Sequence, residues 1–439
     1  MTRTLIKGGC VLSLNSKTGN HREADVLIDG AVIAEVGKDL RARDAEVIDA
    51  QDSIVMPGFV DTHRHVWESL FRGLGDIPGV SVPAALYGPH FSSEDVYAAT
   101  LIGLLGAAEA GITTVVDWSD IQHDDACTEA ALQAQSDSGL RTIFVHAAAT
   151  WTEGNDGWQA RLRRLAAQDA PALSTFAAGP QEPMRGDLDR TVGDWALARE
   201  LGLRIHTHAG TEASAGGVVS DLAGKGLLGS DVTLVHCTHF SGADLEAVAS
   251  SGTAVSLTPS SEMAGGLGRP PIQQLIDLGV RPGLGVDNER LGPGDMFAQM
   301  RSVISVQHAT LFDLKLAGKA GIPNLLNTRE VLRYATVEAA RVAGVGDVVG
   351  SLTPGRQADL IMLRTDKANI FPINDPIGAV VWGMDTSNVD WVFVAGRPVK
   401  RAGVLQGDVA RASDLANAAL GRVAAAAGLL TGAALEGAR

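Results

Sequence analysis

The chain has 439 residues, of which 45% are apolar and 5% aromatic, and it carries a net charge of −15. This length predicts a large domain with a smaller one, and the composition suits an α/β enzyme rather than a disordered or fibrous chain. No block of lysines or arginines interrupts the acidic sequence, so nucleic acid and anionic membranes are not expected partners.

The three cysteines, Cys10, Cys127 and Cys237, are odd in number and form no CxxC pair. A disulfide framework is therefore not expected, and a reducing compartment fits best. No stretch reaches the roughly 18 apolar residues that a membrane span needs. We expect a cytoplasmic protein that is a monomer or forms a homodimer or larger homo-oligomer.

The first fifty residues contain short strand-like runs split by glycine and Asp-Gly turns. From residue 54 the rhythm becomes strand, loop, helix. The expected strands are 54–62, 113–118, 142–146, 174–178, 203–208, 232–236, 254–257 and 282–286. The expected helices include 93–110, 124–138, 188–201, 242–251 and 294–308. Eight mostly apolar strands alternating with helices over about 250 residues predict a (β/α)8 TIM barrel over 57–345.

Strand-like runs return near the end of the chain, at 359–363, 379–382, 391–394 and 397–399. Both ends of the chain therefore look like β structure. We expect residues 1–56 and 346–409 to form one small β-sandwich beside the barrel, followed by an alanine-rich helical tail over 410–439.

Several chemically active side chains follow the predicted barrel strands. They are His63, His65, His206, His208, His236 and Asp287. Because the carboxyl ends of barrel strands open onto one face, residues far apart in the sequence meet there. Imidazoles and a carboxylate with one open position are typical of a catalytic site for zinc or a similar divalent metal.

Spacing supports this interpretation for the first pair. Side chains alternate along a strand, so His63 and His65 point to the same side and Arg64 points away. His206 and His208 have the same relation. A lone histidine is more often a hydrogen-bonded core residue, but a pair that follows Met-Pro-Gly-Phe-Val-Asp-Thr favours metal ligation.

The segment Val-Met-Pro-Gly-Phe-Val-Asp-Thr-His-Arg-His resembles the amidohydrolase superfamily, in the branch that holds cytosine deaminase, adenosine-type deaminases and triazine hydrolases. Strand eight of that branch resembles residues 284–287, Leu-Gly-Val-Asp. The segment in which the branch returns to the β-sandwich resembles residues 352–360, Leu-Thr-Pro-Gly-Arg-Gln-Ala-Asp-Leu. The resemblance spans nearly the whole chain. It implies metal-dependent hydrolysis of C–N or related bonds in a small, often cyclic molecule.

The resemblance implies a role for each matching position. The metal ligands are His63, His65, His208 and Asp287, with His206 as the alternative to His208 for the third histidine. His236 matches a histidine that contacts substrate. On mechanistic grounds, Asp287 is also expected to accept a proton from the metal-bound water. Strand four carries no lysine for a second metal, so one divalent ion is expected, with zinc the first choice and iron, manganese or cobalt as alternatives.

One position departs from the deaminase pattern. Deaminases of this branch carry a proton-shuttling glutamate three residues after the strand-five histidine, where this chain has Thr211. Other carboxylates lie near strand ends. Glu262 and Glu212 are candidate catalytic acids, and Glu182 is a candidate substrate contact. A solvated loop residue is the alternative for each.

Three tryptophans, Trp67, Trp118 and Trp151, follow strands one to three. With His206 they are expected to line a pocket for a flat or apolar substrate, although ordinary packing explains the tryptophans equally well. Because the usual glutamate is missing, hydrolysis of C–Cl, carbamate or thiocarbamate bonds stays an alternative to C–N hydrolysis. A metal-binding protein without catalysis on the same fold is the third possibility.

Overall fold

The computed structural model describes residues 3–74, 82–149, 157–183, 188–211 and 217–428. Within them, a parallel sheet of eight strands runs in the order β13-β12-β11-β10-β9-β8-β7-β6. These strands are β6 (Phe59–Arg64), β7 (Ile112–Ser119), β8 (Arg141–Ala147), β9 (Ser174–Gly179), β10 (Arg204–Ala209), β11 (Val232–His236), β12 (Ala254–Leu257) and β13 (Gly283–Leu284). Every position in these strands is buried except Thr175, which is exposed, and Phe176 and Arg204, which are half-buried. Such burial is expected for strands covered by helices.

The ring closes between its first and last strands. The backbone N–H of His65 donates to the carbonyl of Asp287 at 2.7 Å, and the N–H of Asp287 donates to the carbonyl of His63 at 2.9 Å. The approach is tight because a Cβ on Gly285 would lie 2.8 Å from the backbone of His63. This closure confirms the predicted TIM barrel.

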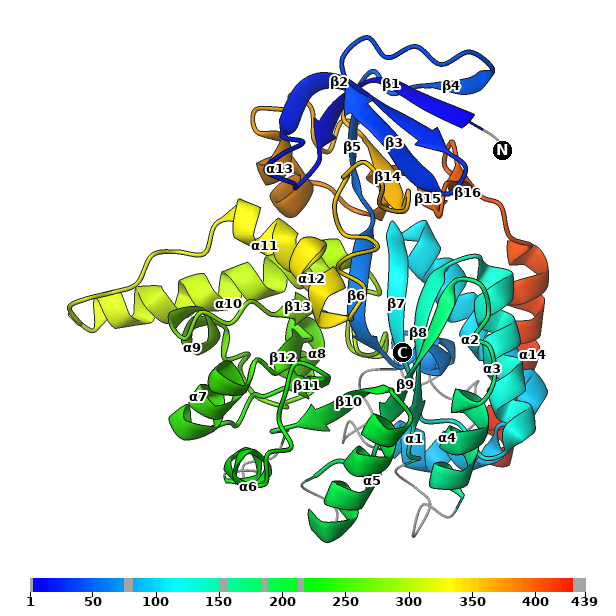
Figure 1. The fold of residues 1–439 in the computed structure, drawn as a ribbon, viewed down its shortest axis with the longest axis vertical. Coiled ribbons are helices and arrows are strands. Elements are labelled where there is room, and N and C mark those ends of the chain that lie inside the picture. The colour runs from blue at the N-terminus through cyan, green and yellow to red at the C-terminus, as the bar shows by residue number, and fades with distance from the viewer. Residues whose placement is uncertain (1–2, 75–81, 150–156, 184–187, 212–216, 429–439) are drawn as a thin grey trace, which may run out of the picture.

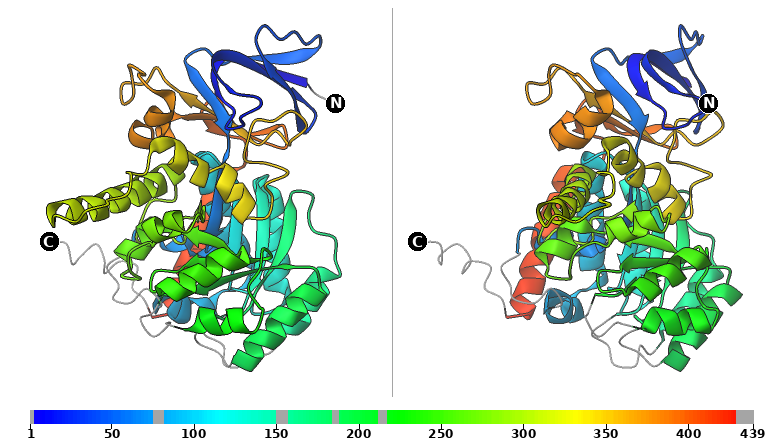
Figure 2. Two further views of the ribbon diagram at one scale, coloured as in Figure 1. Left: turned by 60° about the vertical axis from the view of Figure 1, so that its left-hand side comes forward. Right: turned by 90° about the vertical axis from the view of Figure 1, so that its left-hand side faces the viewer.

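Helices surround the barrel, as Figures 1 and 2 show. The longer ones are α2 (Ser93–Glu109), α3 (Asp125–Ser138), α4 (Trp158–Ala166), α5 (Leu188–Glu200), α7 (Gly242–Ser251), α10 (Met296–Leu316) and α14 (Val409–Ala426). The shorter ones are α1 (Val82–Tyr87), α6 (Val218–Gly224), α8 (Pro259–Ala264), α9 (Ile272–Asp277), α11 (Thr328–Tyr334), α12 (Val337–Val342) and α13 (Pro376–Gly378). Serine capping boxes start α2 and α7.

The two chain ends meet in a second sheet above the barrel (Figure 1), in the order β17-β16-β15-β14-β5-β1-β2-β3, with β4 beside β1. Its strands are β1 (Arg3–Leu12), β2 (Asn20–Asp29), β3 (Val32–Gly37), β4 (Ala45–Asp49), β5 (Ser53–Pro57), β14 (Leu360–Arg364), β15 (Val389–Val394), β16 (Arg397–Arg401) and β17 (Val404–Leu405). The antiparallel pairing of β5 with β14 joins the two ends. Buried side chains from both ends, such as Val26, Ile33 and Leu360, form its core.

Two expectations about individual elements are wrong. The strand expected over 54–62 is two strands, because Gly58 separates β5 in the upper sheet from β6 in the barrel. The strand expected over 379–382 is instead a π-helical turn, Ala379–Gly383, that continues from α13. Its apolar run Ala-Val-Val-Trp buries Val380 and Val381 against the main core, so burial and not strand pairing explains the pattern.

The two-ended sheet leads to a first prediction. A chain that ends at Gly350 lacks β14, which pairs with β5 from Ser53 to Pro57. We expect insoluble protein, because β5 would expose an unpaired edge and the core residues it buries. A chain that ends at Gly407 keeps every strand of this sheet and serves as the control in a solubility and circular dichroism assay. Soluble, active protein from the shorter chain would contradict the proposed division into 1–56 with 346–409 and 57–345.

Candidate metal-dependent active site

The histidines predicted at the strand ends converge inside the mouth of the barrel. Nε2 of His208 lies 3.0 Å from Nε2 of His63 and 3.3 Å from Nε2 of His65. Oδ1 of Asp287 lies 3.6 Å from Nε2 of His63 and 3.5 Å from Nε2 of His65. The structure therefore brings together the four residues predicted as metal ligands.

The spacing of these atoms fits a metal ion. Ligand atoms about 2.0–2.1 Å from zinc at tetrahedral angles are about 3.4 Å from one another, close to the separations between the histidines and Asp287. His63 belongs to two groups of potential ligands, one with His65 and Asp287 and one with His208 and His236. His236 therefore lies within reach of the same centre, on the side of His208.

The remote nitrogens of three of these rings each face a carboxylate. Nδ1 of His65 lies 3.3 Å from Oδ1 of Asp120, and Nδ1 of His236 lies 3.3 Å from Oε1 of Glu262. Nδ1 of His208 lies 3.1 Å from Oε1 of Glu182. A carboxylate behind a histidine fixes its ring orientation and makes it a better metal ligand.

His63 is supported differently. Its Nδ1 lies 3.1 Å from Nε2 of His206, and the two rings stack with centroids 5.3 Å apart. His206 comes two residues before His208 on β10, so it points to the same side but one layer deeper in the barrel. The His206 ring is buried and contacts the proposed ligand His63 instead of facing the open end of the barrel.

Charge states at the site also suit a cation. Burial lowers the pKa of His63 well below its usual value, and it lowers the pKa of His208 as well. Burial alone would raise the pKa of Asp287, but contact with His63 and the nearby histidines brings it below the usual value. Neutral imidazoles and an ionised carboxylate are the forms that coordinate metals.

For His65, burial opposes a positive charge, but Asp120 outweighs burial and raises the pKa to about 10. The same negative charge favours a cation bound at Nε2 of this ring.

Two of these positions have a backbone conformation that is uncommon for residues other than glycine. His236 has φ +74° and Asp287 has φ +68°. Such left-handed residues cost about 1–3 kcal/mol each and cluster at active sites, where the surrounding structure holds them. His236 ends β11 and Asp287 follows β13, and both side chains lie in the cluster.

Glu262 is fully buried at the first turn of α8. Its Oε1 accepts a hydrogen bond from the backbone N–H of Thr258 at 2.8 Å and faces His236, whereas Oε2 has no hydrogen-bond partner among the described residues. Burial raises the pKa of this carboxyl. The alternative raised from the sequence, that Glu262 is a solvated loop residue, is therefore wrong.

The tryptophans have different surroundings. The centroid of the Trp118 ring lies 4.5 Å from that of His208 and 6.0 Å from that of His63, so Trp118 borders the cluster. Trp67 packs edge-on against Phe71 and Phe91 in the core, and its Nε1 donates to Asp120 at 2.7 Å. Trp67 thus binds Asp120, whose carboxylate faces the proposed ligand His65, and its ring is buried in the core. Trp151 and Glu212 lie outside the described residues.

Asp120 and the pair Arg64–Glu289 were missed by the sequence analysis. Asp120 follows β7, so the strand-end rule that found the histidines would have found it too. Arg64 was read only as the residue turned away from the metal. Its partner Glu289 comes 225 positions later in the chain and has no local signal.

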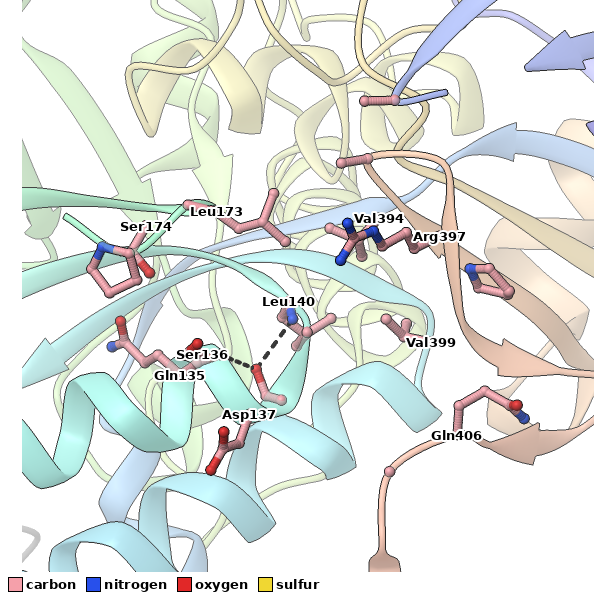
Figure 3. A pocket seen from close by; sticks show the side chains of 18 residues that line it. Gln135, Ser136, Asp137, Leu140, Leu173, Ser174, Val394, Arg397, Val399 and Gln406 are labelled. Atoms are coloured by element: carbon pink, nitrogen blue, oxygen red, sulfur yellow. Dashed lines mark hydrogen bonds between the residues drawn. The ribbon is translucent and has the colours of Figure 1, made fainter. Parts of the chain in front are cut away.

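A cavity of about 470 Å³ lies at the opposite end of the barrel (Figure 3). Leu140 and Leu173 line it at the amino ends of β8 and β9, and Val394 and Val399 line it from the upper sheet. It contains none of the clustered histidines and is a space between the two sheets rather than the reaction site. No helix in the described part of the chain is long and apolar enough to cross a membrane.

Comparison with known proteins agrees with this geometry. A 5-methylthioadenosine/S-adenosylhomocysteine deaminase of Symbiobacterium thermophilum is 29% identical and covers 91% of this chain and 94% of its own length. A 5'-deoxyadenosine deaminase of Methanosarcina mazei is 28% identical, over 90% of this chain and 92% of its own.

Among solved structures, an adenosine deaminase from Xanthomonas campestris with bound zinc superimposes with a TM-score of 0.83 at 22% identity, covering 97% of this chain and 99% of its own. Atrazine chlorohydrolase of Arthrobacter aurescens with zinc has a TM-score of 0.79 at 23% identity, covering 95% and 100%.

The model of the amidohydrolase family matches residues 54–399, which include the whole barrel and part of the upper sheet. With the histidine cluster and the deaminase relatives, this match confirms the predicted metal-dependent hydrolase of C–N bonds. The chain belongs to the amidohydrolase family.

Proposed function

We propose that this hydrolase binds one zinc ion through His63, His65, His208 and Asp287 and removes an amino group from a small nitrogen heterocycle. The observation that carries the proposal is the convergence of three Nε2 atoms and one carboxylate oxygen at separations of 3.0–3.6 Å. When bound, the metal supplies chemistry by lowering the pKa of a coordinated water toward about 7.

The surrounding residues have distinct proposed roles. Asp287 accepts a proton at Oδ1 and delivers it to the leaving group. His236, held from behind by Glu262, donates a hydrogen bond to a ring nitrogen or carbonyl of the substrate. Trp118 borders the substrate beside His208. His206 and Glu182, which the sequence suggested as substrate contacts, support the proposed ligands His63 and His208 instead.

Glu262 is proposed to carry the proton that the glutamate of other deaminases carries. Its buried Oε2 has no partner among the described residues, and burial favours the protonated form that can donate. Thr211, at the position where the resemblance expects that glutamate, has a hydroxyl that does not titrate near neutral pH.

Metal content gives the most direct prediction. Purified protein is expected to hold one equivalent of zinc by elemental analysis, because neighbouring ligand atoms of the four proposed ligands lie 3.0–3.6 Å apart. Removal by a chelator should abolish turnover, and added zinc should restore it. Two equivalents per chain, or full activity without metal, would contradict the proposed site.

A substrate panel tests the reaction. We expect ammonia release from 5'-deoxyadenosine, 5'-methylthioadenosine or an aminated heterocycle of similar size, because the relatives named above are deaminases of such nucleosides. The His63→Ala variant is the matched control for background hydrolysis. Failure to release ammonia from any of these compounds, with the metal bound, would reject the substrate class but not the hydrolase.

Dechlorination is the second candidate, and Thr211 favours it. Chloride is a good leaving group and needs no proton, so a site without the usual glutamate suits this reaction. Chloride release from a chlorinated triazine, without ammonia release from the nucleosides, would select this candidate.

We place the protein in the cytoplasm, which the free thiols of Cys10, Cys127 and Cys237 support.

A further inference from the structure

A fully buried arginine stands between two of the proposed ligands. Arg64 and its partner Asp61 are both 0% exposed. Nε of Arg64 donates to Oδ2 of Asp61 at 2.8 Å, Nη1 donates to Oε1 of Glu289 at 2.7 Å, and Nη2 donates to the carbonyl of Gly294 at 2.7 Å. The guanidinium therefore binds three separate groups from the first barrel strand and the segment that follows the last one.

The partners of Arg64 hold the backbone of the ligand residues. Oδ1 of Asp61 accepts hydrogen bonds from the N–H of Val286 at 3.0 Å and of His63 at 3.3 Å. Glu289 follows Asp287 by two residues, and it also accepts from Ser69 Oγ at 3.3 Å. This buried network thus spans the seam of the barrel, the place where β6 meets the segment after β13 and the N–H of Asp287 donates to the carbonyl of His63.

The seam needs such support because Asp287 has the left-handed φ of +68°. A strained residue persists only when its neighbours fix it from several sides. We propose that Arg64 is a positioning residue that sets metal affinity by holding His63, His65 and Asp287 in register across the closure of the barrel. The inference rests on the proposed metal site.

The chemistry of the network explains why arginine occupies this position. Two carboxylates and a carbonyl in different directions match the rigid planar fork of a guanidinium, whereas an ammonium presents one compact charge on a flexible stem. Lysine at position 64 would keep the positive charge between Asp61 and Glu289 but lose the simultaneous contacts. Arg64→Lys therefore separates geometry from charge.

The test compares Arg64→Lys with Arg141→Lys. Arg141 is 8% exposed, and its Nε donates to Oδ2 of buried Asp359 at 2.9 Å, at the amino end of β8 away from the histidines. Zinc affinity is measured by competition with a chelator, and the absorption spectrum of cobalt-loaded protein reports the ligand geometry. We expect Arg64→Lys to weaken zinc binding about 10–100-fold and to change the spectrum. Arg141→Lys should lower Tm and leave both metal readouts native.

A second variant covers the case in which Arg64→Lys does not fold. A Cβ on Gly294 would lie 2.6 Å from Oε1 of Glu289, so Gly294→Ala displaces Glu289 without removing any charge. It should weaken zinc binding in the same direction, with a smaller effect. Native metal affinity and spectrum in the folded Arg64 or Gly294 variant, or equal metal loss in Arg141→Lys, would overturn the positioning role. Failure of the unmodified protein to bind zinc would instead refute the proposed metal site.

Discussion

Replacing Asp287 with asparagine is expected to lower kcat by about 10²–10⁴-fold while the protein keeps part of its metal. Asparagine retains an oxygen near His63 and His65 but accepts no proton from water. The nearby histidines hold the pKa of the native carboxyl below its usual value, so the base form is present across the working pH range. Steady-state kinetics and elemental analysis on the same preparation give the two readouts.

Asp244→Asn is the matched control for this substitution. Asp244 is also buried, but it caps α7 through Ser241 and lies outside the histidine cluster. This variant should lose stability and keep its turnover number. A native rate in Asp287→Asn would show that the proton goes to another group and that the proposed role is wrong.

Replacing Glu262 with glutamine is expected to lower kcat by about 10²–10⁴-fold with little change in KM, if this residue supplies the proton that Thr211 cannot. Glutamine has nearly the same shape and keeps an oxygen for the Thr258 N–H, which donates to Oε1 at 2.8 Å in the native protein. A residue that only bound the substrate would mainly raise KM. Glu212→Gln on the same substrate is the companion variant.

The pH profile adds a second readout for Glu262. The donor works when protonated, and burial raises its pKa. The kcat of the native enzyme should therefore fall as pH rises through this raised value, and that decline should be absent in Glu262→Gln. If the Glu262 and Glu212 variants both match the native enzyme, no replacement acid exists at these positions. The reaction would then need a good leaving group, as in dechlorination.

Much of the candidate site could be predicted from the sequence because it depends on local rules. Alternation along β6 places His63 and His65 on one side, and the parallel strands of a barrel bring their carboxyl ends to one face. These two rules require no knowledge of side-chain packing. They were sufficient to predict that His208 and Asp287 would lie beside the first pair.

Other features depended on contacts between distant segments. Trp67 and Trp118 look alike in the sequence, yet one packs against Phe71 and supports Asp120, while the other borders His208. The sequence left Glu262 as either a catalytic acid or a solvated loop residue, and α8 places it, fully buried, against His236. Burial and partner choice depend on how helices pack on the barrel, which residue order along one strand does not specify.

The sequence by itself determined the alternation of strands and helices, the two-ended β structure and the six candidate residues at the strand ends, since periodicity and strand-end placement are local properties. The resemblance to the amidohydrolase superfamily then selected four of the six as proposed metal ligands. Only the tertiary structure decided which groups stand behind those ligands. Asp120, His206 and the Arg64–Glu289 pair acquire their positions when β6 closes against β13 and the loops fold over the barrel. Their contacts join residues 55 to 225 positions apart, so they depend on the closed fold and leave no periodic signal in the chain.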